Sequence, residues 1–198
     1  MGAVYPIFNQ LTTREDKERL LKQKSLAIWL TGLSGSGKST IAIELDKILH
    51  TQHFLAQVLD GDNIRTGISN NLDFSIEGRK ENLRRIAEVN KLYICSGLIT
   101  INSFISPLNE SREMIRDIVG PDNFFLVYID TPLEVCESRD VKGLYAKARS
   151  GKISQFTGID SPFEIPEQAD LIIKTVDRSP KDCAEKLYQI ILPKIQAN

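Results

Sequence analysis

Eight consecutive residues early in the chain have the types and spacing of a phosphate-binding loop: Gly32-Leu33-Ser34-Gly35-Ser36-Gly37-Lys38-Ser39. In this G-x-x-x-x-G-K-S pattern, glycines let backbone N–H groups turn inward around phosphates. The ammonium group of Lys38 is expected to reach the β- and γ-phosphate oxygens, and the Ser39 hydroxyl to bind Mg²⁺. The pattern therefore predicts a site for a nucleoside triphosphate and its magnesium ion.

The residues on either side of the loop fit this interpretation. Residues 26–30 form an apolar run of the length expected for a buried strand. Four apolar residues after the loop have the spacing of one helix face: Ile41, Leu45, Ile48 and Leu49. A helix that begins at the loop directs its free N–H groups and positive dipole end at the anion. Strand, loop and helix thus come in the order that a phosphate site requires.

Two carboxylates follow the next apolar segment, residues 54–59. If Asp60 and Asp62 continue that strand, its two-residue period puts both side chains on one face, at the edge where parallel sheets bind ligands. Asp60, nearer the sheet, is expected to hold Mg²⁺-bound water. Asp62, beside Asn63 and Arg65, is expected to act as the base. A turn that uses Asp-Gly-Asp for structure alone is the alternative.

A long helix is expected over residues 77–96. Its buried side is expected to carry Leu83, Ile86, Ala87, Val89, Tyr93 and Ile94. Arg79, Asn82 and Arg85 recur every three residues and can share a different side. Planar arginine forks suit phosphate and sulfate, whereas a solvated face with surface ion pairs is the alternative.

Strands and helices alternate through the rest of the chain. The other expected elements are strands at 98–105, 124–130 and 170–175, and helices at 110–119, 132–139 and 180–192. This alternation predicts an α/β fold with a P-loop NTPase-type parallel sheet and helices on both faces. Residues 25–198 are expected to form one domain. Residues 1–24 are expected to form an arm, with Thr12 and Glu15 in capping-box spacing, and Thr131 is expected to cap helix 132–139.

Residues 143–166 have the composition of a mobile lid. The segment contains Gly, Ser and Pro breakers together with Lys147, Arg149 and Lys152. Loops of this length inside compact domains are usually functional. A basic lid that closes over phosphates would exclude water from the reaction.

Composition restricts the class of protein. The chain has 198 residues, 41% of them hydrophobic, and a net charge of −1, which favours neither nucleic acid nor an anionic membrane as partner. Its longest apolar run, residues 124–129, is too short to span a bilayer, and a cytoplasmic protein is expected. Three cysteines lack metal or disulfide spacing and are expected to be buried or neutral thiols: Cys95, Cys136 and Cys183. His50 and His53 lack a ligand cluster and are expected to be surface residues, not catalysts.

Several classes of phosphate-loop protein remain to be distinguished. A switch GTPase needs an N-K-x-D motif, which the sequence lacks. Transport and motor ATPases usually have longer chains. An arginine-rich helix and a basic lid in a short chain favour phosphoryl transfer to a small anionic acceptor. Kinases for a nucleoside monophosphate or an antibiotic, and a nucleotide-binding module without turnover, remain the alternatives.

Six blocks in one order resemble the adenylylsulfate (APS) kinase family over residues 25 to about 175. They are the phosphate loop, Asp60-Gly61-Asp62-Asn63-Ile64-Arg65, Arg79-Lys80-Glu81-Asn82-Leu83-Arg84-Arg85, Ser103-Phe104-Ile105-Ser106-Pro107, Lys142-Gly143-Leu144-Tyr145 and Phe156-Thr157-Gly158-Ile159. The resemblance implies transfer of the ATP γ-phosphoryl group to the 3′-hydroxyl of APS, with Mg²⁺, as a step of sulfate activation. The sequence departs from the family's usual residues at Leu108, Asn109 and Asp73.

The resemblance also implies roles for individual residues. ATP would be bound by residues 32–39 and by Thr40, with Lys38 catalytic and Ser39 and Asp60 at the metal. The APS site would consist of Asp62, Asn63, Ile64, Arg65, Phe74, Arg79, Asn82, Ile105, Ser106, Lys142, Phe156 and Thr157. Phe74 and Phe156 would sandwich the adenine, with core packing as the alternative.

Ser106 matches the position of a phosphoserine intermediate in some members of the family. No His or Lys in its block offers a base, so direct in-line transfer is expected. A homodimer is expected.

Overall fold

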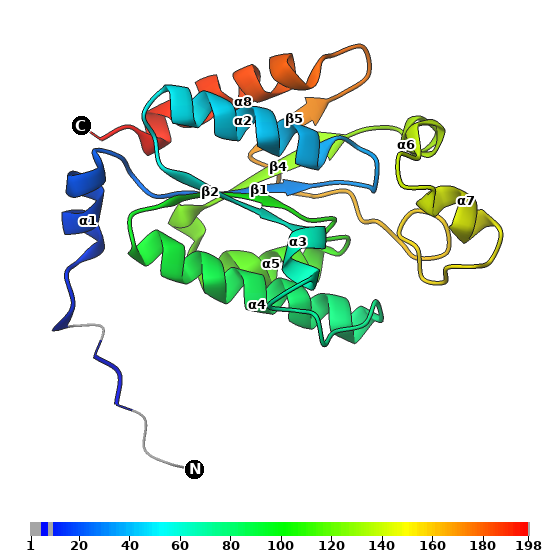
Figure 1. The fold of residues 1–198 in the computed structure, drawn as a ribbon, viewed down its shortest axis with the longest axis horizontal. Helices are drawn as coiled ribbons and strands as arrows, with labels where there is room; N and C mark the ends of the chain where they lie inside the picture. The colour runs from blue at the N-terminus through cyan, green and yellow to red at the C-terminus, as the bar shows by residue number, and fades with distance from the viewer. Residues whose placement is uncertain (1–4, 8–9, 198) are drawn as a thin grey trace.

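A parallel sheet of five strands forms the centre of the molecule (Figure 1). The structure, a computed structural model, describes residues 5–7 and 10–197. The strand order is β2-β3-β1-β4-β5, and every neighbouring pair is parallel. The strands are β1 (Ala27–Thr31), β2 (Ala56–Asp60), β3 (Ile99–Ser103), β4 (Phe124–Asp130) and β5 (Leu171–Lys174). Strand β1, which precedes the phosphate loop, is central and buried throughout.

Helices cover both faces of the sheet, as expected for the α/β class. The helices are α1 (Arg14–Leu21), α2 (Lys38–Thr51), α3 (Gly61–Arg65), α4 (Ile76–Cys95), α5 (Asn109–Val119), α6 (Leu133–Arg139), α7 (Leu144–Arg149) and α8 (Pro180–Ile195), with the 3-10 helix η2 (Pro121–Asn123). Helices α2 and α8 pack on one face around Leu45 and Leu187, whereas α4 and α5 pack on the other around Trp29 (Figure 1). Within the described residues no helix has the length and apolar character needed to cross a membrane.

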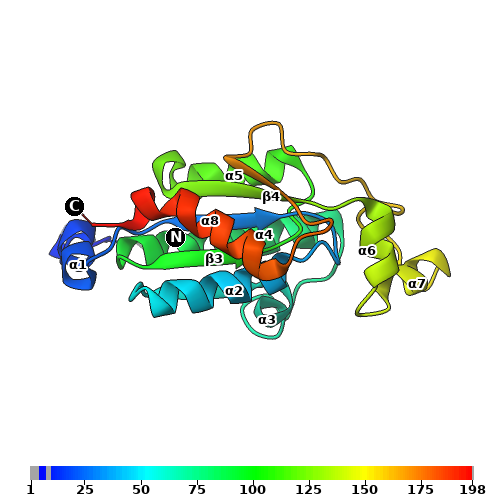
Figure 2. The ribbon, with the colours of Figure 1, turned by 90° about the horizontal axis from the view of Figure 1, so that it is seen from above.

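The two ends of the sheet carry different elements. Because all strands are parallel, their carboxyl ends share one edge, where ligands bind in open α/β sheets. Figure 2 shows α6 and α7 extending beyond this edge, and α1 at the opposite end of the molecule. The phosphate loop, the end of β2 and the end of β3 therefore meet at the edge beyond which α6 and α7 extend.

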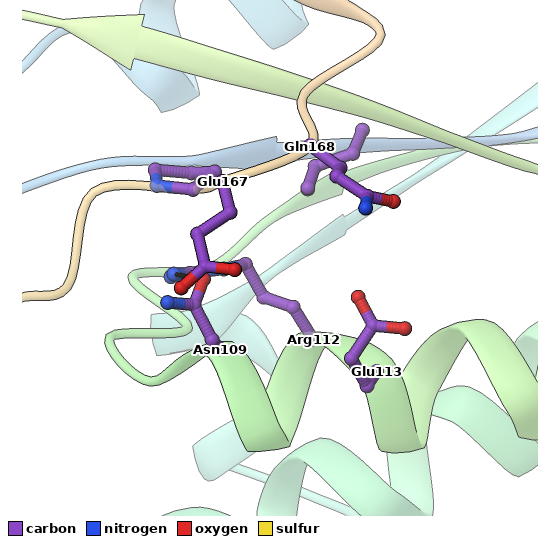
Figure 3. Close-up of a pocket in the computed structure, with 7 residues that line it drawn as sticks. Asn109, Arg112, Glu113, Glu167 and Gln168 are labelled. Carbon is purple, nitrogen blue, oxygen red and sulfur yellow. Dashed lines mark hydrogen bonds between the residues drawn. The ribbon is translucent and has the colours of Figure 1, made fainter.

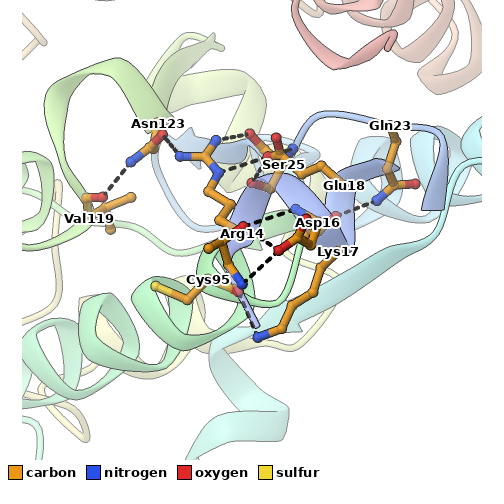
Figure 4. A network of polar contacts seen from close by, with 11 residues as sticks. Arg14, Asp16, Lys17, Glu18, Gln23, Ser25, Cys95, Val119 and Asn123 are labelled. Atoms are coloured by element: carbon orange, nitrogen blue, oxygen red, sulfur yellow. Dashed lines mark hydrogen bonds and ion pairs between the residues drawn. The ribbon is translucent and has the colours of Figure 1, made fainter. Parts of the chain in front are cut away.

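Helix α1 is bound to the amino end of the sheet by polar contacts (Figure 4). Arg14 donates hydrogen bonds to Oδ1 of Asn123 at 2.6 Å and to the carbonyl of Ser25 at 3.2 Å. Glu18 pairs with Arg14 at 2.7 Å and accepts the N–H of Ser25 at 2.8 Å. The second half of the expected arm is thus fastened to the domain.

Gln23, directly after α1, is fully buried. Its Nε2 donates to the carbonyls of Leu55 at 3.0 Å and Gly97 at 2.9 Å. Its Oε1 accepts the N–H of Leu55 at 2.8 Å. The side chain therefore pairs with the backbone at the amino ends of β2 and β3.

Three sequence-based predictions of local structure are wrong. The capping box of α1 is made by Thr13 and Asp16, one residue later than expected, because the helix begins at Arg14. Thr131 does not cap α6; its hydroxyl donates to the Ser36 carbonyl at 3.0 Å instead. The last helix continues through Pro193 to Ile195, since a proline in the final turn removes only one hydrogen bond.

A further error concerns the two carboxylates. Strand β2 ends at Asp60, whose side chain accepts the N–H of Asp62 at 3.1 Å and so caps α3. Asp62 therefore lies in the first turn of a helix, and the two-residue period of a strand does not apply to it. An Asp that can cap the following helix favours a turn here over further strand.

Two of the three cysteines and both histidines lie where the sequence suggested. Cys136 and Cys183 are buried free thiols, and burial raises the pKa of both above the usual value for cysteine. Cys95 is an exposed free thiol, and His50 and His53 are exposed.

Candidate active site

The phosphate loop between β1 and α2 depends on glycine for its shape. Gly35 and Gly37 have φ angles of 74° and 100°, in the left-handed region that other residues rarely adopt. The side chain of Lys38 is buried, and its Nζ donates to the carbonyl of Leu33 at 2.6 Å and to Oγ of Ser36 at 3.3 Å. Burial lowers the pKa of Lys38 to about 8. Because both acceptors are neutral, an anion that entered the loop would compensate the buried charge.

Oxygen atoms from three elements meet at the start of α2. Ser39 donates to Oδ2 of Asp60 at 2.6 Å, and its Oγ lies 3.1 Å from Oγ of Ser103. Mg²⁺ takes oxygen ligands and usually binds through one or two carboxylates plus waters and substrate phosphates. A hydroxyl and a carboxylate beside a phosphate loop fit that ion. No group of three or more His, Cys, Asp or Glu side chains suited to a metal occurs in the part of the chain that the structure describes.

Asp62 and Lys142 form an ion pair that joins α3 to the residue before the expected lid. Their side chains are 72% and 60% exposed, so the pair adds little to folding stability. Its effect is positional, because it brings the expected base beside the first residues of the expected lid. The neighbouring Asn63 is exposed, whereas the side chain of Ile64 packs into the core between β2 and α4.

Two arginines face the same region. The guanidinium carbon of Arg65 lies 4.2 Å from the ring centre of Phe74, which is 64% exposed. Arg79 donates to the carbonyl of Phe74 at 2.8 Å, to Oγ1 of Thr157 at 2.9 Å, and to the carbonyl of Gln155. Burial, and then the positive charge of Arg65, lower the pKa of Arg79. Two positive charges that interact in this way favour an anion between them.

Asn82, one turn further along α4, has an orphaned atom. The residue is 5% exposed, and its Oδ1 has no hydrogen-bond partner among the described residues. A buried polar atom without a partner is rare and suggests a missing ligand or water. Arg85, by contrast, is engaged with protein atoms, including the carbonyl of Ile68 and Oδ1 of Asn71, both at 2.8 Å.

The loop after β3 is fixed from below. Ser106 is 2% exposed and has a φ of 43°, unusual for a residue other than glycine. Its Oγ accepts the indole N–H of Trp29 at 2.9 Å. The carbonyl of Ile105 accepts the hydroxyl of Thr31 at 2.6 Å and the N–H of Gly32 at 3.4 Å. This loop is therefore attached directly to the phosphate loop.

The expected lid, residues 143–166, is more structured than the sequence indicated. It contains α7, and Phe156 is buried in a cluster with Cys136, Tyr145 and Ala148. The rings of Tyr145 and Phe156 meet edge to face, 5.0 Å apart. Phe156 thus has the packed environment that the sequence left as the alternative, whereas Phe74 is exposed.

Three residues contact the phosphate loop in a way that the sequence analysis did not predict. Tyr145 donates to the Ser34 carbonyl at 2.9 Å, Arg139 to the Gly35 carbonyl at 3.3 Å, and Thr131 to the Ser36 carbonyl. All three come from the segment around α6 and α7, so the far side of the site supports the loop backbone.

These features define a P-loop kinase: the phosphate loop, the order of the strands and the carboxylate beside Ser39. Solved structures agree at the level of fold. A gluconokinase from Sinorhizobium meliloti superposes with a TM-score of 0.53 at 15% identity, over 86% of this chain and 97% of that one. At this identity the likeness concerns the fold alone.

The family follows from closer comparisons. The family model for adenylylsulphate kinase matches residues 24–174. The adenylyl-sulfate kinase of Bacteroides thetaiotaomicron is 58% identical, over 98% of this chain and 96% of its own. That of Clostridium kluyveri is 50% identical, over 94% and 93%. The chain belongs to the adenylylsulphate kinase family, which confirms the resemblance found in the sequence.

A solved structure of this family contains ligands. The Mycobacterium tuberculosis APS kinase in complex with AMPPNP and APS superposes with a TM-score of 0.82 at 44% identity. The match covers 85% of this chain and 98% of that one.

Proposed function

We propose that the protein transfers the γ-phosphoryl group of ATP to the 3′-hydroxyl of APS, giving 3′-phospho-APS and ADP. The observation that carries the proposal is the 44% identity to a kinase solved with APS and an ATP analogue. The pair of guanidinium groups at Arg65 and Arg79, with the orphaned Oδ1 of Asn82, supports it. These groups suit an anion that also carries hydrogen-bonding groups.

The nucleotide would lie along the phosphate loop. Backbone N–H groups of residues 32–40 surround the phosphates, and Lys38 contacts the β- and γ-phosphate oxygens. Ser39 and Asp60 would hold Mg²⁺, which neutralises phosphate charge when bound. These residues orient the γ-phosphoryl group toward the carboxyl ends of β2 and β3.

The acceptor would lie between α4 and the loop after β3. The oxygen of the 3′-hydroxyl bonds to the γ-phosphorus, while the bond from that phosphorus to the ADP oxygen breaks. Asp62 accepts the proton that the hydroxyl loses. Arg65 and Arg79 bind the phosphosulfate. Phe74, exposed beside Arg65, stacks on the adenine. The surface of the APS site is completed by Asn63, Ile105, Ser106, Lys142 and Thr157. Ile64 contributes backbone atoms only.

An ADP-release assay with ATP plus APS, run beside ATP plus AMP and ATP alone, tests this function. Turnover that depends on APS, with 3′-phospho-APS detected by mass spectrometry, is expected. Turnover with ATP plus AMP, but not with ATP plus APS, would indicate a nucleoside monophosphate kinase. Binding of ATP without turnover on any acceptor would indicate a binding module.

Ser106→Ala is expected to keep the rate within about ten-fold of wild type, because the hydroxyl accepts from Trp29 and only that modest contact is lost. The thermal midpoint should fall, since the buried indole N–H loses its partner. Steady-state rates and thermal unfolding measure the two effects. A kinetically competent phosphoserine trapped at position 106 would contradict direct transfer.

We expect ATP analogue plus APS to protect residues 143–166 from trypsin. Thr157 of the lid accepts a hydrogen bond from Arg79, and Lys142, directly before the lid, pairs with Asp62. Ligands would tighten both connections. Cleavage after Lys147, Arg149 and Lys152, all exposed, should slow several-fold. Cleavage after Lys186 in α8 serves as the control. Equal rates at the lid sites with and without ligands would show that the segment does not close.

We propose further that the enzyme acts in the cytoplasm as a homodimer. Free thiols at Cys95, Cys136 and Cys183 suit a reducing compartment. Light scattering coupled to gel filtration would measure the mass in solution, and a monomer would contradict the dimer.

A further inference from the structure

Arg112 is a buried cation outside the site described above. It lies in the first turns of α5 and is 2% exposed. Its Nη1 donates to the carbonyl of Ser106 at 2.6 Å, and its Nη2 to the carbonyl of Glu164 at 2.7 Å and to Oδ1 of Asn109. One guanidinium group therefore joins the loop after β3 to the segment that ends the lid.

Stability alone does not account for this arrangement. All three acceptors of Arg112 are neutral oxygens, and no carboxylate in the described part of the chain lies within ion-pair distance of it. Burial lowers the pKa of Arg112 and outweighs the carboxylates of Glu164, Glu113 and Glu167, which raise it, so holding the cation here costs free energy. A side chain of this kind is better explained by the geometry that it holds.

The geometry held on one side is that of Ser106. Its φ of 43° is a left-handed conformation, which is strained in a residue other than glycine and persists only when neighbours fix it. Trp29 binds the hydroxyl and Arg112 the carbonyl of this residue. Both donors are buried, so the loop is held from two directions beneath the APS site.

The geometry held on the other side is that of Glu164. Its backbone N–H donates to the Pro107 carbonyl at 2.8 Å, and its Oε2 accepts the N–H of Asn109 at 2.6 Å. Leu108, at the N-cap of α5, makes no side-chain cap bond, so Glu164 caps this helix from the lid segment. Figure 3 shows Asn109 and Arg112 together on α5, facing the segment that carries Glu167 and Gln168.

We propose that Arg112 is a positioning residue for the APS site: it fixes the Ser106 carbonyl and anchors the carboxyl end of the lid to the same point. The loop after β3 and the carboxyl end of the lid then move as one body. The proposal rests on the proposed function for its kinetic consequence, but the anchor itself can be tested without substrate.

Arg112→Lys provides the test, because an ammonium group retains the charge but cannot span two carbonyls as a fork does. The KM for APS is expected to rise about 10- to 100-fold, the usual effect of losing a charge-assisted hydrogen bond, while the KM for ATP changes less than about two-fold. Arg19→Lys, an exposed arginine of α1 at the opposite end of the molecule, is the control and should keep both KM values.

Amide hydrogen exchange of residues 163–168 in ligand-free protein gives a readout that does not depend on activity. Faster exchange in Arg112→Lys, and not in Arg19→Lys, is expected. Should Arg112→Lys not fold, Glu164→Ala removes an exposed carboxylate from the same anchor and should shift the APS KM and the exchange in the same directions.

Two outcomes would overturn the proposal. One is unchanged exchange at 163–168 in a folded variant. The other is a rise in both KM values together with a fall in thermal midpoint, which would indicate a structural role alone. If wild-type enzyme does not turn over APS, the proposed function fails, and the exchange result still decides whether Arg112 anchors the lid.

Discussion

Replacing Lys38 with alanine is expected to lower kcat by about 10²–10³-fold or more, the range for removal of one charge-stabilising group from a transition state. The ammonium group follows the charge that develops on the transferred phosphoryl group. In the free protein it is buried against neutral acceptors, the carbonyl of Leu33 and Oγ of Ser36. Its removal therefore relieves a desolvation cost, and the free energy of unfolding should not decrease.

Steady-state kinetics and denaturant unfolding of Lys38→Ala would separate catalysis from folding. Lys47→Ala, on the exposed side of α2, is the matched control and should keep its rate. Because burial lowers the pKa of Lys38 to about 8, the folded state disfavours the charged lysine. Wild-type stability should therefore gain from a rise in pH above about 8, and the variant should lack this gain. Near-normal turnover in Lys38→Ala would contradict the phosphate-loop assignment.

Asp62→Asn is expected to reduce kcat by about 10²–10⁴-fold, the typical loss for a general base. Asparagine keeps the shape of the side chain and can still hydrogen-bond to the 3′-hydroxyl, but it cannot accept the proton. ATP affinity should change little, since Asp62 pairs with Lys142 and not with the atoms at Ser39. The transition state of phosphoryl transfer is loose, so positioning still supplies most of the rate.

Asp60→Asn is the natural counterpart. Because Asp60 accepts from Ser39, its loss should weaken Mg²⁺-ATP binding more than it lowers kcat. Titration of each variant with Mg²⁺ and ATP, followed by single-turnover kinetics, distinguishes the roles. Weakened Mg²⁺-ATP binding in Asp62→Asn, with normal binding in Asp60→Asn, would mean that the two roles are reversed.

The sheet and the phosphate loop could be predicted because their signals are local. Strand β4 was expected at residues 124–130 and occupies them, since a nearly continuous apolar run suits a strand buried on both faces. Helix α4 begins and ends one residue before its expected limits, with Ser75 as the cap. Periodicity failed at Asp62, where capping by Asp60 starts a helix immediately after the strand.

The framework around the site could not be predicted, because its contacts join residues far apart in the chain. Trp29 reaches Ser106 across 77 positions, and Thr131 reaches Ser36 across 95. A threonine before a proline looks like a helix cap in any local window. Only the packing of β4 against β1 brings its hydroxyl to the phosphate loop.

The buried amide of Gln23 imitates a peptide unit. It exchanges a donor and an acceptor with Leu55, the pairing that another strand residue would make, and gives its second hydrogen to Gly97. Glutamine alone presents an amide at this reach; asparagine is too short, and glutamate would set a carboxylate against two carbonyls. Few other residues should therefore be tolerated at position 23. The segment before β1 should be inherited together with the domain, not exchanged as a separate module.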